Sequence, residues 1–251
     1  MKLGAQFYSI RDKAKNPEEI RNSFIEMKRI GYESVQLSGI GEISAEELRD
    51  ISLETALPIV CTHINPELIK ANIKKIIDEH KIYGCPVIGI GSMPTEYRGS
   101  YEGVKAFIKD FSPIANVARD AGLKFAYHNH AFEFEKHNGR SIYDVLIEDF
   151  ESVDFIIDTY WMKYAGENFL KYIKLIGNER TNNIHFKDMK CEPRGEICPC
   201  GQGVIDFTPV IKLCDTLGIE NALVEQDNAP DTNDSYGQMA ISYENLIKLF
   251  K

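Results

Sequence analysis

Short apolar runs rich in β-forming residues recur along the chain. Between them lie longer segments in which an apolar residue returns every three or four positions. The first pattern predicts buried strands and the second predicts amphipathic helices. The helical period is clear at Ile20, Phe24, Met27 and Ile30, which fall on one helix face. The predicted strands lie in KLGAQFY, SVQL, PIVCTH, PVIGIG, KFAYHNH, DFIIDTYW, NIHFKD and NALVEQD.

Several predicted helices end at a glycine just before the next strand, namely at Gly31, Gly84, Gly122 and Gly218. Glycine adopts the left-handed backbone conformation that closes a helix. Strands that alternate with helices pair in parallel through right-handed crossovers, and about eight such units close a barrel. The sequence therefore predicts the α/β class and one domain over residues 1–251, folded as a single (β/α)8 TIM barrel.

A doubly wound sheet is the alternative, but it normally carries a phosphate turn with three glycines. The segments GIGEIS, GIGSMP and GQGVID each lack the third glycine. The formal net charge of −9 would repel a phosphate backbone, so we expect no nucleic-acid partner. The first residues lack the apolar stretch of a signal peptide, and no later run approaches about 18 apolar residues. We therefore expect a cytoplasmic protein without a membrane partner.

The six cysteines fall into two groups. Cys61, Cys85 and Cys214 lie in apolar segments, which suits buried thiols in a reducing compartment. The other three lie in CEPRGEICPC, where no further His or Cys stands at the spacing of a zinc site. We interpret this segment as a loop with incidental thiols, although an exposed cysteine pair could oxidise.

Polar residues gather at the carboxyl ends of the predicted strands, which is where TIM barrels build their active sites. Polar groups that are half-buried there cost free energy unless they are paired or bind something. His80 and His137 lie in a charged helical segment and in a polar loop, so we expect both at the surface. The strand-end residues are His63, His128, His130, Asp158, Trp161, His185, Lys187, Asp188, Glu225 and Asp227.

Asp158, His185 and Glu225 end three successive strands, so their side chains should converge near the barrel axis. Two carboxylates and an imidazole suit a divalent ion, such as Mn²⁺, Mg²⁺, Co²⁺ or Zn²⁺. Because side chains alternate along a strand, His128 and His130 share a face, and one of them can reach the axis as a fourth ligand. Each residue alone also fits a surface hydrogen bond or a helix cap. The combination on three successive strands favours a metal site.

These residues lie in segments that resemble the xylose isomerase-like sugar phosphate isomerase/epimerase superfamily over nearly the whole chain. The resemblance implies four ligands, usually Glu, Asp, His and Glu, around an ion that is often Mn²⁺. The last three match Asp158, His185 and Glu225. The first departs, because His128 stands in place of a carboxylate that in true epimerases binds metal and moves protons. The resemblance thus implies His128 as the fourth ligand, and Glu133 could fold back to take the role of the missing carboxylate. The segments are QFYSIRD, IGYESVQL, AYHNHAFEF, IDTYW, IHFKD, GQGVIDF and LVEQD.

The resemblance also implies proton abstraction from a carbon next to a carbonyl, through an enediolate stabilised by the metal. We expect Glu225 to be a ligand and proton carrier, with Glu133 or His130 as the second acid or base. Lys187 would clamp a substrate oxygen, unless it pairs only with Asp188 or Asp158, and Arg11 could equally be a surface residue. The expected substrate-binding residues are Tyr8, Arg11, His63, Asn129 and Trp161.

Three functions stay open at this point. The favoured one is a metal-dependent isomerase or epimerase of a keto-sugar or related polyol. The second is a lyase, either inosose dehydratase-like or 3-keto-glycoside-cleaving, and the third is a non-catalytic sugar-binding barrel. A DNA-repair nuclease of the same superfamily would bind a polyanion, which the acidic balance disfavours. The expected partner is a small sugar or polyol, and the resemblance is compatible with a homo-oligomer.

Overall fold

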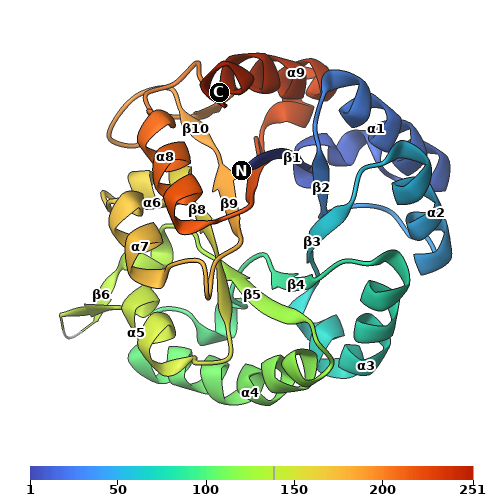
Figure 1. Cartoon of the computed structure of the whole chain (residues 1–251). Coiled ribbons are helices and arrows are strands. Elements are labelled where there is room, and N and C mark those ends of the chain that lie inside the picture. The colour runs from blue at the N-terminus through green and yellow to red at the C-terminus, as the bar shows by residue number, and fades with distance from the viewer. Residues whose placement is uncertain (138, 251) are drawn as a thin grey trace.

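Eight parallel strands form a closed barrel in the computed structural model, which describes residues 1–137 and 139–250 (Figure 1). Around the barrel the order is β1-β12-β9-β8-β5-β4-β3-β2, so the first strand pairs with the last. The predicted (β/α)8 barrel and all eight predicted strands are confirmed. The strands are β1 (Lys2–Gln6), β2 (Ser34–Leu37), β3 (Ile59–His63), β4 (Val87–Ile90), β5 (Lys124–His128), β8 (Asp154–Asp158), β9 (Asn183–Phe186) and β12 (Asn221–Val224).

Helices surround the barrel and cover the outer faces of the strands (Figure 1). Gly31, Gly84, Gly122 and Gly218 have positive φ angles at or just after helix ends, as predicted. Short 3-10 helices, η1 (Phe7–Lys13), η2 (Thr95–Tyr97), η3 (Phe132–Phe134), η4 (Ala229–Thr232) and η5 (Ile247–Leu249), lie in the connections. The α-helices are α1 (Pro17–Ile30), α2 (Ala45–Thr55), α3 (Pro66–Tyr83), α4 (Tyr101–Asp120), α5 (Ile142–Asp149), α6 (Thr159–Tyr164), α7 (Phe169–Ile176), α8 (Thr208–Leu217) and α9 (Ser235–Leu246).

A small apolar layer, separate from the main core, contains Cys61, Ala126, Ile156 and Leu223. Along the chain, these residues stand two positions before His63, His128, Asp158 and Glu225. Because side chains on one strand face alternate with a period of two, the apolar layer and the polar layer after it share the inner face of the barrel. The main core lies between the strands and the helices and holds large aromatic residues such as Phe125 and Phe155.

His80 is fully buried, so the expectation of a surface position is wrong. Its side chain is buried between α3 and the barrel wall, with Nε2 2.9 Å from Thr62 Oγ1 and Nδ1 2.8 Å from the Ile76 carbonyl oxygen. Thr62 supplies a polar partner on the outer face of β3, so the histidine is hydrogen-bonded in the core. His137, also expected at the surface, is half-buried in β6 (Lys136–His137).

Two hairpins extend the connections beyond the predicted barrel elements: β6 with β7 (Arg140–Ser141), and β10 (Asp188–Met189) with β11 (Ile197–Cys198). The cysteine-rich segment runs through the second hairpin, where Cys198 is buried and Cys191 is exposed, both as free thiols. Across residues 1–137 and 139–250, no helix combines the length and the apolar character that crossing a membrane requires.

Candidate metal centre and active-site pocket

Four buried side chains meet at the carboxyl end of the barrel: His128, Asp158, His185 and Glu225. They come from β5, β8, β9 and the residue after β12, and one ligand atom of each lies within 4.8 Å of all the others. This ligand cluster contains the four residues that the sequence analysis expected around a metal. Its two imidazoles and two carboxylates are donors that divalent ions such as Mn²⁺ and Zn²⁺ accept.

Both histidines of the cluster face a carboxylate. Nε2 of His185 lies 2.8 Å from the Gln36 amide oxygen, and its Nδ1 lies 2.9 Å from Glu225 Oε2. Nδ1 of His128 lies 3.0 Å from the Gly91 carbonyl oxygen, which only accepts hydrogen bonds, so the Nε2 lone pair of the neutral ring faces Asp158 Oδ2 at 3.3 Å. A lone pair and a carboxylate oxygen repel at this distance unless a cation lies between them, so the donor set fits a divalent ion.

Each carboxylate is held through one oxygen and leaves the other for the cluster. Oδ1 of Asp158 caps α6 by accepting the backbone N–H of Trp161 at 2.8 Å, which leaves Oδ2 for the cluster. Oε1 of Glu225 accepts the amide of Gln6 at 2.7 Å, which leaves Oε2. Hydrogen bonds of this kind orient ligands and set their basicity.

Lys187 inserts a buried ammonium beside the cluster, with its side chain 1% exposed. Its Nζ lies 2.7 Å from the carboxylate of Asp227, 3.3 Å from Oε2 of Glu225 and 3.9 Å from Oδ2 of Asp158. The expected alternative, pairing only with Asp158 or Asp188, is incomplete, because Asp227 and Glu225 are the nearer partners. One ammonium leaves three carboxylates incompletely neutralised, which further favours a cation.

Burial dominates the acid and base properties of this region. It raises the pKa of Asp158 and that of Asp227 to about 6 each, although the Lys187 ammonium opposes the shift. For Glu225 burial acts in the same direction, but the Lys187 ammonium and the hydrogen bond with His185 outweigh it and hold the pKa well below the ordinary value.

Three imidazoles at this end have a pKa well below the ordinary value, with burial as the largest cause. They are neutral at pH 7 and can therefore act as ligands or proton acceptors. Their rings form a group, because the ring centres of His63 and His130 lie 5.2 and 5.0 Å from that of His128. A Cβ at Gly91 would come 2.9 Å from His63 Nδ1, so glycine makes room for this ring.

A cavity of about 370 Å³ opens directly onto the ligand cluster. We call this cavity the mouth pocket. Tyr8 and His63, both expected to bind substrate, line it. Its other polar side chains include Ser38, Asn65, Ser92, His128, His130, Lys187, Glu225 and Asp227.

The other expected residues have different surroundings. Asn129 is fully buried, and its amide oxygen accepts the backbone N–H of Asp158 at 3.0 Å, so it positions a ligand. Arg11 donates to the carbonyl oxygens of Tyr8 and Asp227 at 2.7 and 2.9 Å. Trp161 lines a second cavity beside the mouth pocket.

Glu133, expected as a ligand or proton carrier, is buried outside the ligand cluster. Its carboxylate accepts the hydroxyl of Tyr127 at 2.5 Å and the backbone N–H of His130 at 2.9 Å. Burial raises its pKa to about 7. The carboxylate is therefore placed to hold the loop that carries His130.

Gln6 and Gln36 were not singled out in the sequence, although each orients a ligand. Both are fully buried on the inner face of the barrel, near the carboxyl ends of β1 and β2. The available signal was an amide inside the otherwise apolar runs KLGAQFY and SVQL. A buried amide in such a run needs a partner, and here the partners are Glu225 and His185.

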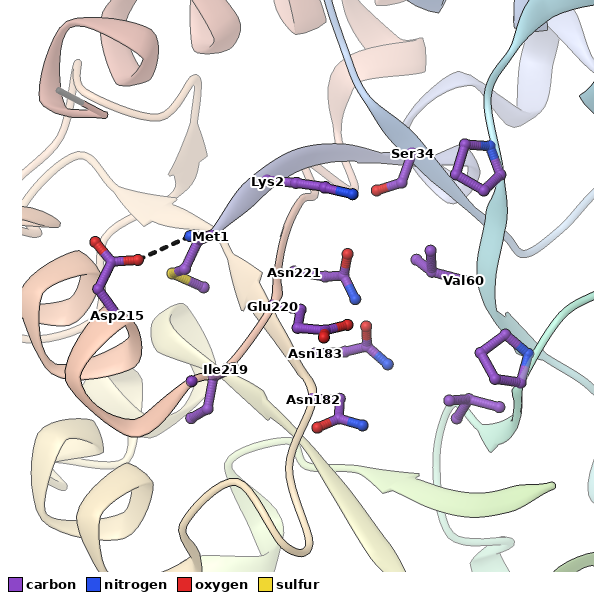
Figure 2. Close-up of a pocket in the computed structure, with 14 residues that line it drawn as sticks. Met1, Lys2, Ser34, Val60, Asn182, Asn183, Asp215, Ile219, Glu220 and Asn221 are labelled. Atoms are coloured by element: carbon purple, nitrogen blue, oxygen red, sulfur yellow. Dashed lines mark hydrogen bonds and ion pairs between the residues drawn. The ribbon is translucent and has the colours of Figure 1, made fainter. Parts of the chain in front are cut away.

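The larger cavity, of about 560 Å³, lies at the amino end of the barrel (Figure 2). Asn182, Asn183, Asn221 and Ser34 line it together with apolar residues such as Val60. Its charged residues are exposed, and Asp215 there forms an ion pair with the terminal amine of Met1 at 2.7 Å. The two ends of the barrel therefore offer different chemistry.

The fold and the site together define a (β/α)8 barrel with a four-ligand cluster at its carboxyl end. A family model described as "Xylose isomerase-like TIM barrel" matches residues 24–239. The chain belongs to this family, and the predicted resemblance is confirmed.

Among curated proteins, the chain is similar to an inosose dehydratase of Clostridium beijerinckii, with 24% identity over 167 residues, 59% of this chain and 56% of that protein. The chain thus spans about half the length of the curated relatives it matches. A solved sugar phosphate isomerase/epimerase of Parabacteroides distasonis has a TM-score of 0.81 at 20% identity, covering 98% of this chain and 93% of that one. A D-allulose 3-epimerase of Methylomonas sp. has a TM-score of 0.72 at 13% identity, covering 99% and 98%.

Proposed function

We propose that this protein is a divalent-metal-dependent enzyme that acts on a keto-sugar or keto-polyol as a carbon–oxygen lyase. It would remove a proton from the carbon next to the carbonyl and then expel a substituent from the following carbon. The observation that carries the proposal is the buried ligand cluster beside the Lys187 ammonium at the base of the mouth pocket. Mn²⁺ is our first candidate for the ion, since imidazole and carboxylate ligands suit it.

A bound divalent ion would supply a Lewis acid for the negative charge that develops on the carbonyl oxygen. Lys187, kept protonated by Glu225 and Asp227 although burial opposes its charge, would donate to a substrate oxygen in the same region. Asp227 would hold that ammonium in place. His130 would accept the proton, because it lines the mouth pocket and its imidazole is neutral.

The elimination balances without a further reactant. The electron pair of the broken C–H bond forms the new C=C bond, and the substituent leaves with its own bonding pair. The proton goes to His130, and the departing oxygen takes a proton from Lys187 or from water. An enone and water, or an enone and an alcohol, are the products.

His128 supports the lyase over simple epimerisation, because an imidazole stands where the resemblance implies a proton-moving carboxylate. The similarity to inosose dehydratase points the same way. Isomerase or epimerase is the second candidate, since Glu225 and His130 follow different strands, β12 and β5, and could carry protons on two sides of a substrate.

The test is incubation of Mn²⁺-loaded protein with inososes and keto-sugars in D₂O, followed by NMR and mass spectrometry. A lyase would produce an enone with loss of water or alcohol. Deuterium on carbon with no such loss would establish the second candidate instead. Metal uptake without either change in any substrate would contradict both reactions and leave a sugar-binding barrel.

A further inference from the structure

A second cavity of about 530 Å³ adjoins the mouth pocket and shares His130 with it. Its walls come from three connections: η3 with Phe132 and Phe134, α6 with Trp161 and Tyr164, and the β10–β11 loop with Arg194. We call it the side cavity. It lies on the same end of the barrel as the ligand cluster, because each of these connections follows the carboxyl end of a barrel strand.

Aromatic rings make up much of the side-cavity wall. The ring centre of His130 lies 5.1 Å from that of Trp161, and it stacks with Phe132 at 6.0 Å with 21° between the planes. The rings of Trp161 and Tyr164 meet edge to face at 5.8 Å. Surfaces of this kind bind flat apolar groups, because aromatic pairs gain energy beyond the area that they bury.

Arg194 adds a cationic group to this aromatic wall. Its guanidinium carbon lies 5.2 Å from the ring centre of Tyr164. A guanidinium stacked on one ring can receive a second planar group on its free face, and it also donates hydrogen bonds to phenolic oxygens. The lining thus suits an aromatic group that carries polar substituents.

The indole of Trp161 connects the two cavities. It lines the side cavity, and its ring centre lies 5.1 Å from the Lys187 ammonium, which lines the mouth pocket. A sugar ring seated against Lys187 and the ligand cluster would lie within reach of the indole. A substrate of sugar size would fill the mouth pocket and leave the larger side cavity to a substituent.

From this arrangement we infer that the side cavity binds an aromatic substituent attached to the sugar or polyol ring. The natural substrate would then be an aryl-substituted keto-sugar, such as an aryl keto-glycoside. This inference rests on the proposed function for the placement of the sugar ring at the ligand cluster. The aromatic lining, however, can be tested by binding alone.

Trp161 provides the probe, because it is the single tryptophan of the chain. Mn²⁺-loaded protein is titrated with phenyl, cyclohexyl and methyl β-D-glucoside while tryptophan emission is followed, and calorimetry measures each affinity. We expect the phenyl glucoside to bind about tenfold more tightly than the methyl glucoside and to change the emission most. The cyclohexyl glucoside separates aromatic stacking from apolar bulk and should lie between them.

Phe132→Leu and Tyr164→Leu keep apolar bulk but remove rings from the side cavity, so both should reduce the phenyl preference to about threefold or less. Tyr243→Leu on α9 is the matched control and should keep the full preference for the phenyl glucoside. Circular dichroism verifies the fold of each variant. Equal affinities for phenyl and methyl glucosides, or a phenyl preference that survives both cavity variants, would overturn the inference. If no keto-sugar is converted but the preference behaves as expected, the proposed reaction fails and the aromatic binding site stands.

Discussion

The two ends of the barrel are both hollow and polar, but they bury different groups. The amino-end cavity is the larger, about 560 Å³ against about 370 Å³ for the mouth pocket. Its buried polar groups are neutral, as in Ser34 and Asn183 (Figure 2). The carboxyl end instead buries charges, with Asp158 0% and Glu225 4% exposed.

This difference shows that the character of the buried groups, rather than cavity size, locates the candidate active site. A buried carboxylate costs several kcal/mol unless it is paired or holds a cation. Neutral amides and hydroxyls cost less and can be satisfied by water. Charge burial at one end only therefore requires an explanation, and metal binding with catalysis supplies one.

The largest expected effect is loss of the metal in Asp158→Asn. Asparagine still caps α6, but it removes a charge from the ligand cluster. Substitution of a residue that hydrogen-bonds to a metal ligand typically weakens metal binding about 10- to 100-fold, so loss of a ligand's charge should weaken it by more than about 100-fold. Calorimetric titration with Mn²⁺ measures this, and Glu220→Gln at the amino-end cavity is the control. Similar metal affinities for these two variants would remove the distinction between the ends.

Lys187→Met should separate metal binding from chemistry. Removing the ammonium eliminates the proposed proton donor, so kcat should fall about 10²- to 10⁴-fold. Metal affinity should be kept or increased, because a neighbouring positive charge is lost. Without metal, the variant should lose about 3 kcal/mol or more of stability, since buried carboxylates lose their partner. Urea unfolding with and without Mn²⁺ measures the stability of the variant. A loss of stability that Mn²⁺ fails to reduce would contradict the proposed metal site.

Gln36→Leu and Ser34→Ala compare the two ends on one strand. Gln36 accepts from His185 near the mouth pocket, whereas Ser34 lines the amino-end cavity two residues earlier. We expect Gln36→Leu to weaken Mn²⁺ binding about 10- to 100-fold and Ser34→Ala to leave it unchanged. Metal titrations of both variants make the comparison. Equal effects would mean that Gln36 acts only through general packing.

The smallest effect concerns His80, a buried polar residue outside both cavities. Burial lowers its pKa to about 4, so between about pH 6.5 and 4 the unfolded chain binds the proton more readily. Stability should therefore fall as the pH drops through this window, by about 1 to 2 kcal/mol at pH 5 for this group. Urea unfolding of the parent and His80→Gln at pH 7 and 5 measures it. A pH dependence unchanged by the substitution would contradict the assignment.

Local sequence patterns predicted most of the architecture. These patterns are the apolar strand runs, the helical period and the glycines at helix ends. They reflect backbone conformation and side-chain alternation, and neighbouring residues along the chain determine both. Strand ends then indicated Asp158, His185 and Glu225, because parallel strands in a closed barrel bring their carboxyl ends together. His128 could be added because it ends its strand on the same face.

The barrel and the residues at its carboxyl end could therefore be inferred from the order of residues along the chain. The use made of these residues became apparent only in the folded structure: Gln6 and Gln36 orient ligands, Asn129 holds the Asp158 backbone, and His80 is buried against Thr62. The cause of this division is the distance along the chain over which each interaction acts. Secondary structure follows from interactions along a few residues, whereas hydrogen-bond partners and pKa values depend on groups brought together from distant strands.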